Sequence, residues 1–396
     1  HMSLGESIEP DNPTMHDFSR RYFTLGAAAL LALNTLKSRA LAAAASQTGL
    51  KEAFADDFLI GTALSNATLE GRNPPLLELI AREFNAITAE NCMKWGQIEP
   101  REGDWQWTLP DALVEYGSKH GMHVVGHTLV WHSQAPPWLF VDSSGKPVAA
   151  DVLNKRLDRH IQTMLGRYHG RVATWDVVNE AIEDDDKGWR KSPWFDILGP
   201  SFMERAFRVA HEADPQARLL YNDYNEHNAG KRNFLVDILR DYQRRGVPIH
   251  GVGFQGHVGL DYPDLGEYEK SIEALAAVGM RVSITELDID VLPRAGQFTG
   301  AEISHLVEYS AQLNPYTKGL PAEIETRLAN RYRQLFELFL KHRDKIDRVT
   351  TWGTYDRESW KNDFPVRGRT NYPLLFDRQL QPKPAHAAIM ELRRKA

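Results

Sequence analysis

The chain has only one cysteine in 396 residues, Cys92, so no disulfide can form within it and its fold must rest on packing. No GxGxxG follows the first apolar run, and the sequence holds no Walker phosphate loop, no HExxH and no GxSxG. A dinucleotide-binding signature is therefore missing after the first run, and the usual signatures of nucleoside triphosphatases, zinc proteases and serine hydrolases are missing from the sequence. A formal net charge of −6 also weighs against a nucleic-acid partner, which would favour a basic surface.

Long hydrophobic runs are scarce too. The apolar run at 22–33 is too short to span a membrane comfortably, and polar residues interrupt it from Asn34 onward. Arg20 and Arg21 precede it and small residues follow at 40–46, a pattern typical of twin-arginine export signals. We predict that residues 15–45 are such a signal, which exports the mature protein to the periplasm or the medium without a membrane anchor. The alternative is a surface helix. Residues 1–14 are interpreted as a leader that carries an expression remnant at its start.

A repeating theme begins near residue 51: a short apolar run ends on polar residues, and a longer amphipathic stretch follows. Helix-like stretches with start and stop signals lie at 110–121 and 233–246. Several of the apolar runs are almost continuously apolar, as parallel strands covered on both sides are. Eight runs occur, at 58–66, 84–91, 123–132, 172–180, 218–226, 251–257, 281–290 and 348–356.

This alternation predicts one catalytic domain over 51–396, an α/β fold of the (β/α)₈ barrel type, with a doubly wound sheet as the alternative. The widest gap between runs, at 291–330, is expected to hold an elaborated loop after the seventh strand.

The ends of the runs carry reactive and sugar-stacking side chains. In a barrel of this type the carboxyl ends of the strands meet at one rim, where the active site lies. Ten tryptophans and thirteen tyrosines fit a carbohydrate binder, because flat rings stack on sugar faces, although cores use aromatics as well. We expect a functional cleft at this rim, built from Glu90, Asn91, Lys94, His127, Trp131, His132, Asn179, Glu180, Asn222, Asp223, Tyr224, Gln255, His257, Glu286, Asp288, Trp352 and Trp360.

Two glutamates, Glu180 and Glu286, end the fourth and seventh runs, on opposite sides of the expected barrel mouth. Glycoside hydrolysis needs two carboxyls that flank the scissile bond: one protonates the leaving oxygen, and the other attacks the anomeric carbon or activates water. Salt bridges at the rim are the structural alternative for both residues.

A metal site is the rival interpretation of the histidines. No metal is expected, because the spacing of these histidines does not match a known metal-binding motif. The histidines are His123, His127, His132 and His257.

Seven blocks of sequence resemble glycoside hydrolase family 10, the endo-β-1,4-xylanases, in that family's order and over residues 51–396. The resemblance implies a (β/α)₈ barrel, a retaining mechanism, no cofactor, and xylan or xylo-oligosaccharides as the partner of a chain expected to act as a monomer. The blocks are ENCMKW (90–95), GHTLVWHSQAPPW (126–138), WDVVNE (175–180), YNDYN (221–225), GVGFQGH (251–257), ITELDI (284–289) and TWGTYDRESW (351–360).

Roles follow from the resemblance by position. Glu180 corresponds to the acid/base and Glu286 to the nucleophile, supported by His257 and Asp288. Asn179 matches an amide that bonds the 2-hydroxyl of the sugar at the cleavage site. The remaining matched positions imply substrate contacts, and Tyr224 is expected at the reducing-side or nucleophile region. These positions are Glu90, Asn91, Lys94, His127, Trp131, Tyr224, Gln255, Trp352 and Trp360.

Three alternatives stay open at this point. A β-1,4-glucanase or a mannanase on a related barrel would use the same pair of glutamates. A non-catalytic polysaccharide-binding protein could retain the barrel as a scaffold, although loss of a glutamate would be its signature and both are present. Within the ENCMKW block, strand alternation predicts that Cys92 belongs to the core.

Overall fold

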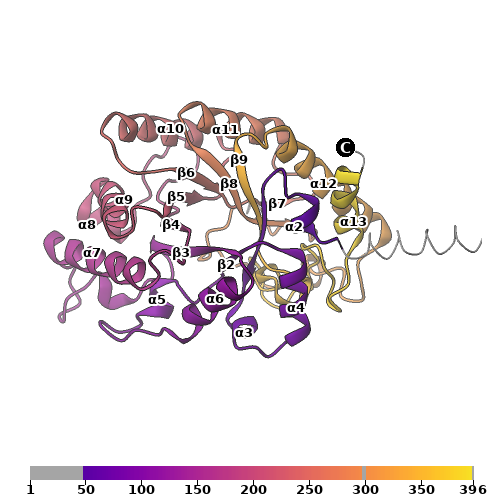
Figure 1. Cartoon of the computed structure of the whole chain (residues 1–396), viewed down its shortest axis with the longest axis horizontal. Helices are drawn as coiled ribbons and strands as arrows, with labels where there is room; N and C mark the ends of the chain where they lie inside the picture. Colours follow the sequence, from indigo (N-terminus) through magenta and orange to yellow (C-terminus); the bar gives the residue numbers. More distant parts are fainter. Residues whose placement is uncertain (1–47, 297–299, 395–396) are drawn as a thin grey trace, which may run out of the picture. The chain divides into compact units, whose positions relative to one another are not determined.

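Parallel strands close into a barrel in the computed structural model, which describes residues 48–296 and 300–394. The order of the sheet is β6-β5-β4-β3-β2-β1-β9-β8-β7, and pairing of β6 with β8 closes the ring of eight strands that leaves β7 outside. Figure 1 shows these strands at the centre of the molecule. Their bounds are β1 Leu59–Leu64, β2 Ala86–Ala89, β3 His123–Trp131, β4 Thr174–Asn179, β5 Arg218–Asp223, β6 Gly251–Phe254, β7 His257–Gly259, β8 Arg281–Asp290 and β9 Ile346–Thr351.

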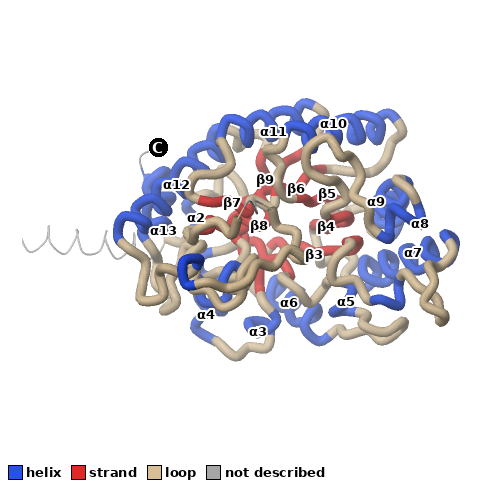
Figure 2. Tube along the Cα trace, turned by 180° about the vertical axis from the view of Figure 1, so that it is seen from behind, coloured by secondary structure: helices blue, strands red, loops and turns tan. Residues whose placement is uncertain are grey.

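Helices cover the outside of the strands (Figures 1 and 2). In α7 the buried residues Leu153, Leu157 and Ile161 recur every four positions, so one face of the helix packs inward. The longer helices are α4 Pro74–Glu83, α6 Thr108–Lys119, α7 Ala150–Arg167, α9 Ser201–Ala213, α10 Ala229–Arg244, α11 Leu265–Ala277, α12 Ala322–Lys341 and α13 Pro384–Arg394. Short helices are α2 Leu50–Ala53, α3 Asn66–Leu69, α5 Trp95–Ile98, α8 Pro193–Leu198, η1 Pro137–Leu139, η2 Ala311–Leu313, η3 Asp356–Glu358 and η4 Trp360–Asn362.

Polar side chains fix where several helices begin. An oxygen of the residue before the helix accepts a hydrogen bond from a backbone N–H of the first turn, which would otherwise lack a partner. The residues that do this are Ser65, Asn73, Ser192, Asn228 and Asp264. The two helices expected at 110–121 and 233–246 are α6 and α10, and each begins two to four residues earlier than its sequence pattern indicates.

The barrel prediction is confirmed, and the doubly wound alternative is wrong because the sheet closes on itself. One predicted strand, at 251–257, differs in detail. Gly256 has a φ of +76° and divides it into β6 and β7. Because β7 then pairs with β8, His257 lies opposite Asp288 instead of continuing along the barrel wall.

Packing between β3 and β4 depends on a glycine. Trp175 of β4 is 1% exposed, and a Cβ on Gly126 of β3 would lie 2.1 Å from its ring. Only a residue without a side chain fits there, so the large indole can fill the space outside the barrel wall. Cys92 is 3% exposed and belongs to the hydrophobic core, as the sequence predicted.

The gap after the seventh barrel strand, β8, holds irregular chain with the short helix η2, and α12 begins at Ala322. The predicted leader at 1–14 and export signal at 15–45 lie outside the described residues. No helix in the described ranges combines the length and apolarity needed to cross a membrane.

Candidate active site

Glu180 directly follows β4, and its φ of +59° turns the chain out of the strand at the rim. Residues other than glycine adopt this conformation rarely, at a cost of about 1–3 kcal/mol. Two bonds hold the turn: the N–H of Glu180 donates to the carbonyl of Asn222 at 2.9 Å, and its carbonyl accepts from Nε of Arg190 at 2.7 Å. A fixed turn of this kind is typical of functional residues.

The carboxyl of Glu180 is buried at 3% exposure. Oε2 accepts from Nε1 of Trp131 at 2.7 Å, and Oε1 accepts from Nε2 of Gln255 at 2.8 Å. Burial raises the pKa of Glu180, and nearby Asp223 raises it further, although His132 and the two hydrogen bonds act in the opposite direction. Glu180 therefore keeps its proton to a higher pH than a free glutamate, as a general acid requires.

Glu286 lies in β8 and is surrounded by donors. Oε1 accepts from Nδ2 of Asn222 at 2.9 Å, and Oε2 lies 2.9 Å from Nε2 of His257. Burial raises the pKa of Glu286, but the hydrogen bond from His257 and the charges of His127 and His257 outweigh it, so the net pKa is lowered. Glu286 is therefore ionised where Glu180 is protonated, and the two carboxyls have opposite states in one cleft.

His257 connects Glu286 to Asp288. Its Nδ1 lies 3.0 Å from Oδ1 of Asp288, whose Oδ2 accepts from Nε1 of Trp360 at 2.7 Å. Burial lowers the pKa of His257, but the two carboxylates outweigh it and raise the pKa to about 9. Both ring nitrogens thus carry hydrogen at neutral pH and donate to the two acids, which holds Glu286 as a carboxylate.

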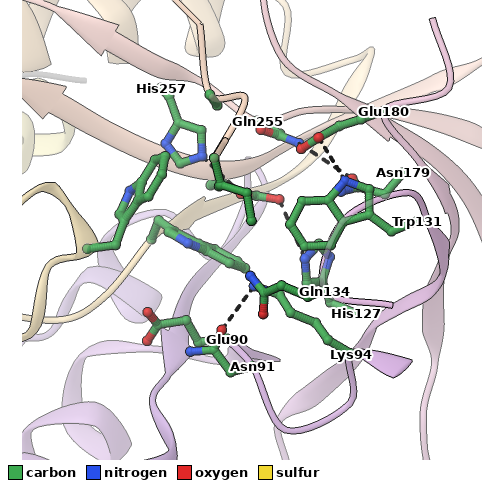
Figure 3. A pocket seen from close by; sticks show the side chains of 15 residues that line it. Glu90, Asn91, Lys94, His127, Trp131, Gln134, Asn179, Glu180, Gln255 and His257 are labelled. Atoms are coloured by element: carbon green, nitrogen blue, oxygen red, sulfur yellow. Dashed lines mark hydrogen bonds and ion pairs between the residues drawn. The ribbon is translucent and has the colours of Figure 1, made fainter. Parts of the chain in front are cut away.

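The opposite wall comes from the end of β2 and the segment after it. Figure 3 shows Glu90, Asn91 and Lys94 across the cleft from Glu180 and Gln255. Nζ of Lys94 donates to Oδ1 of Asn91 at 3.0 Å and lies 5.1 Å from the centre of the Trp131 ring. Burial raises the pKa of Glu90 to about 7, with Lys94 opposing, and burial lowers the pKa of Lys94. This wall therefore presents hydrogen-bond donors and acceptors to the cleft.

His127 is fixed behind Glu286. Its Nδ1 lies 2.8 Å from Oδ2 of Asp176, and its Nε2 lies 4.0 Å from Oε1 of Glu286. The His127 and Trp352 rings are packed edge to face, with their centres 5.3 Å apart. The buried Trp352 follows β9, and Trp360 begins η4. Two indoles therefore flank a buried, polar centre.

These walls enclose a cleft of about 160 Å³. Its lining includes most of the predicted site residues, so residues far apart in the sequence meet there; the predicted residues that do not line it are His132, Asn222, Asp223, Tyr224 and Asp288. The lining residues are Glu90, Asn91, Lys94, His127, Trp131, Gln134, Asn179, Glu180, Gln255, His257, Glu286, Ala301, Ile303, Trp352 and Trp360.

Tyr224 and Asp288 lie one layer behind the cleft. Tyr224 is 5% exposed, and its hydroxyl accepts from Arg190 at 2.9 Å. It stands near Glu180, whose charge contributes to raising the pKa of Tyr224, after burial as the main cause. Asp288 is fully buried behind His257. Both act on the cleft through the residues that they hold.

Asn222, predicted from its place at a strand end, donates to both Asn179 and Glu286, at 2.8 and 2.9 Å, and so connects β4 with β8. Sequence reasoning missed Gln134, Ala301 and Ile303, which line the cleft. Gln134 lies within the sequence block at 126–138, which was a usable signal. Ala301 and Ile303 line the cleft from the loop after β8, where no periodicity or motif marks them. Only the return of that loop across the rim brings them there.

One group of side chains beside the cleft has the spacing of a cation site. Ligand atoms of His132, Glu180 and Glu302 lie within 4.8 Å of one another. The guanidinium of Arg190 already contacts Glu302 at 3.1 Å, and Nε2 of His132 lies 2.9 Å from the same oxygen. These protein groups already pair with Glu302, and both oxygens of Glu180 are bound to Trp131 and Gln255.

Known proteins resemble this chain in sequence and in fold. Residues 49–392 match the family model for glycosyl hydrolase family 10. An endo-1,4-beta-xylanase A of Xylanibacter ruminicola is 44% identical, over 89% of this chain and 95% of that protein. An endo-1,4-beta-xylanase of Geobacillus stearothermophilus is 43% identical, over 87% and 98%. A solved family 10 endoxylanase from a sugarcane soil metagenome superposes with a TM-score of 0.85 and 53% identity, over 87% of this chain and 100% of that one. The chain belongs to glycosyl hydrolase family 10 and is a glycoside hydrolase.

Proposed function

We propose that the protein is an endo-1,4-β-xylanase that hydrolyses internal bonds of xylan with retention of anomeric configuration. The observation that carries this is the opposite ionisation of two carboxyls in one cleft: the pKa of Glu180 is raised and that of Glu286 is lowered. Such a pair can donate a proton and attack carbon at the same time.

In the first step, Glu286 attacks the anomeric carbon of the bound sugar. The bond from that carbon to the leaving sugar breaks, and the departing oxygen takes the proton of Glu180. The product is a glycosyl ester of Glu286. His257 and Asn222, which hydrogen-bond the nucleophile, keep it ionised and oriented until the attack.

In the second step, Glu180 is a carboxylate and takes a proton from water. The water oxygen attacks the same anomeric carbon, the ester bond to Glu286 breaks, and Glu180 regains its proton. Two inversions give net retention. Nε1 of Trp131 and Nε2 of Gln255 donate to Glu180, which stabilises its ionised state between the steps.

Xylan is supported as the substrate by the names of the relatives, which are endo-1,4-beta-xylanases at 43–44% identity. The resemblance to family 10 also favours a pentose at the wall made of Lys94, His127 and Trp352. All three side chains are buried at the cleft, and a hexose would bring an added hydroxymethyl group against such a wall.

A substrate panel tests this assignment. Xylan, cellulose and mannan are incubated side by side with the protein, and reducing ends are counted while product lengths are followed by chromatography. We expect release from xylan, with oligosaccharides of several lengths appearing early. Faster release from cellulose or mannan would favour the glucanase or mannanase alternative, and no release from any of them would favour a binding protein.

The pH profile of kcat/KM is expected to be bell-shaped. On the acid side, activity falls as Glu286 gains a proton, at a pH below the ordinary glutamate pKa. On the alkaline side, activity falls as Glu180 loses its proton, at a pH above the ordinary glutamate pKa.

Two variants should move the limbs of this profile separately. His257→Asn removes groups that lower the pKa of Glu286, so the acid limb moves to higher pH. Trp131→Phe removes a donor that lowers the pKa of Glu180, so the alkaline limb moves to higher pH. Each variant serves as the control of the other, and a shift of both limbs in either variant contradicts the assignment.

A further inference from the structure

A second hollow adjoins the catalytic cleft on the side of Glu286. Its narrow chamber of about 20 Å³ shares His257 with the cleft. A wider chamber of about 360 Å³ follows and shares Tyr262, Asp290 and Arg294 with the narrow one. The three spaces are therefore neighbours, and the wider chamber has room for a sugar ring.

The narrow chamber carries an excess of positive charge. Its lining includes the cationic side chains of Lys361, Arg369 and Arg294. Asp290 is the one carboxylate among the lining residues. Oδ2 of Asp290 lies 3.7 Å from Nζ of Lys361 and 3.8 Å from a guanidinium nitrogen of Arg369, beyond hydrogen-bond distance from both. One carboxylate cannot neutralise these cations.

Arg369 adds a donor without an acceptor. Its side chain is fully buried, at 0% exposure, and its Nε has no hydrogen-bond partner among the described residues. A buried donor of this kind costs free energy unless a ligand or water accepts from it. The chamber can hold about one water or one small anionic group.

Arg294 lies at the junction of the two chambers. Its guanidinium stacks over the Tyr262 ring at 3.8 Å, and in the described chain it makes no ion pair. Arg327, in the wider chamber, instead binds both oxygens of Asp261 at 2.8–2.9 Å. The charge available to a ligand is therefore that of Arg294, at the entrance to the Lys361–Arg369 chamber.

We infer that this hollow binds a uronic acid branch of the polysaccharide, with its carboxylate at Arg294 and the narrow chamber. The branch would leave the main chain near Glu286, since His257 borders both spaces. Its ring would occupy the wider chamber, where Tyr316 and Ile324 give partly buried apolar surface. A carboxylate suits the guanidinium, because ionised hydrogen bonds are the strong ones. The inference rests on the proposed function.

The test compares two xylo-oligosaccharides that differ only in the branch: one carries a glucuronic acid, and its twin has that carboxyl reduced to a hydroxymethyl group. The wild type is expected to cleave the acidic compound with a kcat/KM about fivefold above its twin, a preference that falls with added salt. Arg294→Gln should lose the preference, while Arg294→Lys should keep part of it. Unbranched xylo-oligosaccharide should be cleaved equally by all three proteins.

Arg240→Gln is the matched control, because the substitution removes the same charge at a site away from the cleft. Arg240 is an exposed residue of α10 that pairs with Asp237. This variant should keep the wild-type preference. Equal cleavage of both twins by the wild type, or a preference that survives in Arg294→Gln, would overturn the inference. The inference would also be overturned if chloride changed the cleavage of unbranched substrate while the two branched compounds were cleaved equally. The hollow would then bind free anions and not the branch. A failure of the proposed function is distinguishable from these outcomes, because the wild type would then not cleave unbranched xylo-oligosaccharide.

Discussion

Replacement of Glu286 by alanine is expected to lower kcat on xylan by at least about 10⁴-fold, or about 5.5 kcal/mol in activation free energy. The reason is that no other carboxylate is held ionised by both His257 and Asn222 in the described cleft. Binding of xylo-oligosaccharide, measured by calorimetry, should stay close to wild type, because the sugar-binding walls remain in place.

Azide provides the decisive readout for Glu286→Ala. The anion can enter the space of the lost carboxylate and attack an activated aryl xylobioside, so the product azide should have inverted configuration by NMR. A variant that had simply unfolded would show neither binding nor rescue. Activity near wild type, or rescue with retained configuration, would refute Glu286 as the nucleophile.

Replacement of Glu180 by alanine is expected to depend strongly on the leaving group. For unactivated xylo-oligosaccharides, kcat/KM should fall by about 10³-fold, because the departing oxygen loses its proton donor. For a dinitrophenyl xylobioside, which needs little protonation, it should stay within about tenfold. The second step then lacks its base, so a burst of dinitrophenol should precede slow turnover.

Azide acts differently on this variant. It should accelerate turnover of the glycosyl-enzyme and give a product of retained configuration, opposite to Glu286→Ala. Glu183→Gln is the control, a partly exposed carboxylate on the same loop that pairs with Arg190 and does not line the cleft. It should remain near wild type. An equal loss on both substrates would contradict the acid/base role of Glu180.

The sequence predicted the barrel because each strand repeats one local signal, an apolar run that ends on polar residues. It also placed the two glutamates of the proposed catalytic pair on one rim, since parallel strands end on the same side. Glu180 and Glu286 need no side-chain detail for that placement. The division of 251–257 could not be predicted, because it depends on which neighbouring strand His257 pairs with.

The sequence alone therefore determined the fold, the rim and the identity of most cleft residues, for which strand period and chain order suffice. The tertiary structure decided three further matters. It set the opposite ionisation of the two glutamates, because burial and partners such as Gln255 and His257 come from other strands. It placed Tyr224 behind the cleft, where the Tyr224 hydroxyl accepts a hydrogen bond from Arg190. It also returned Ala301 and Ile303 to the cleft wall, since a long loop carries no periodic signal of where it packs.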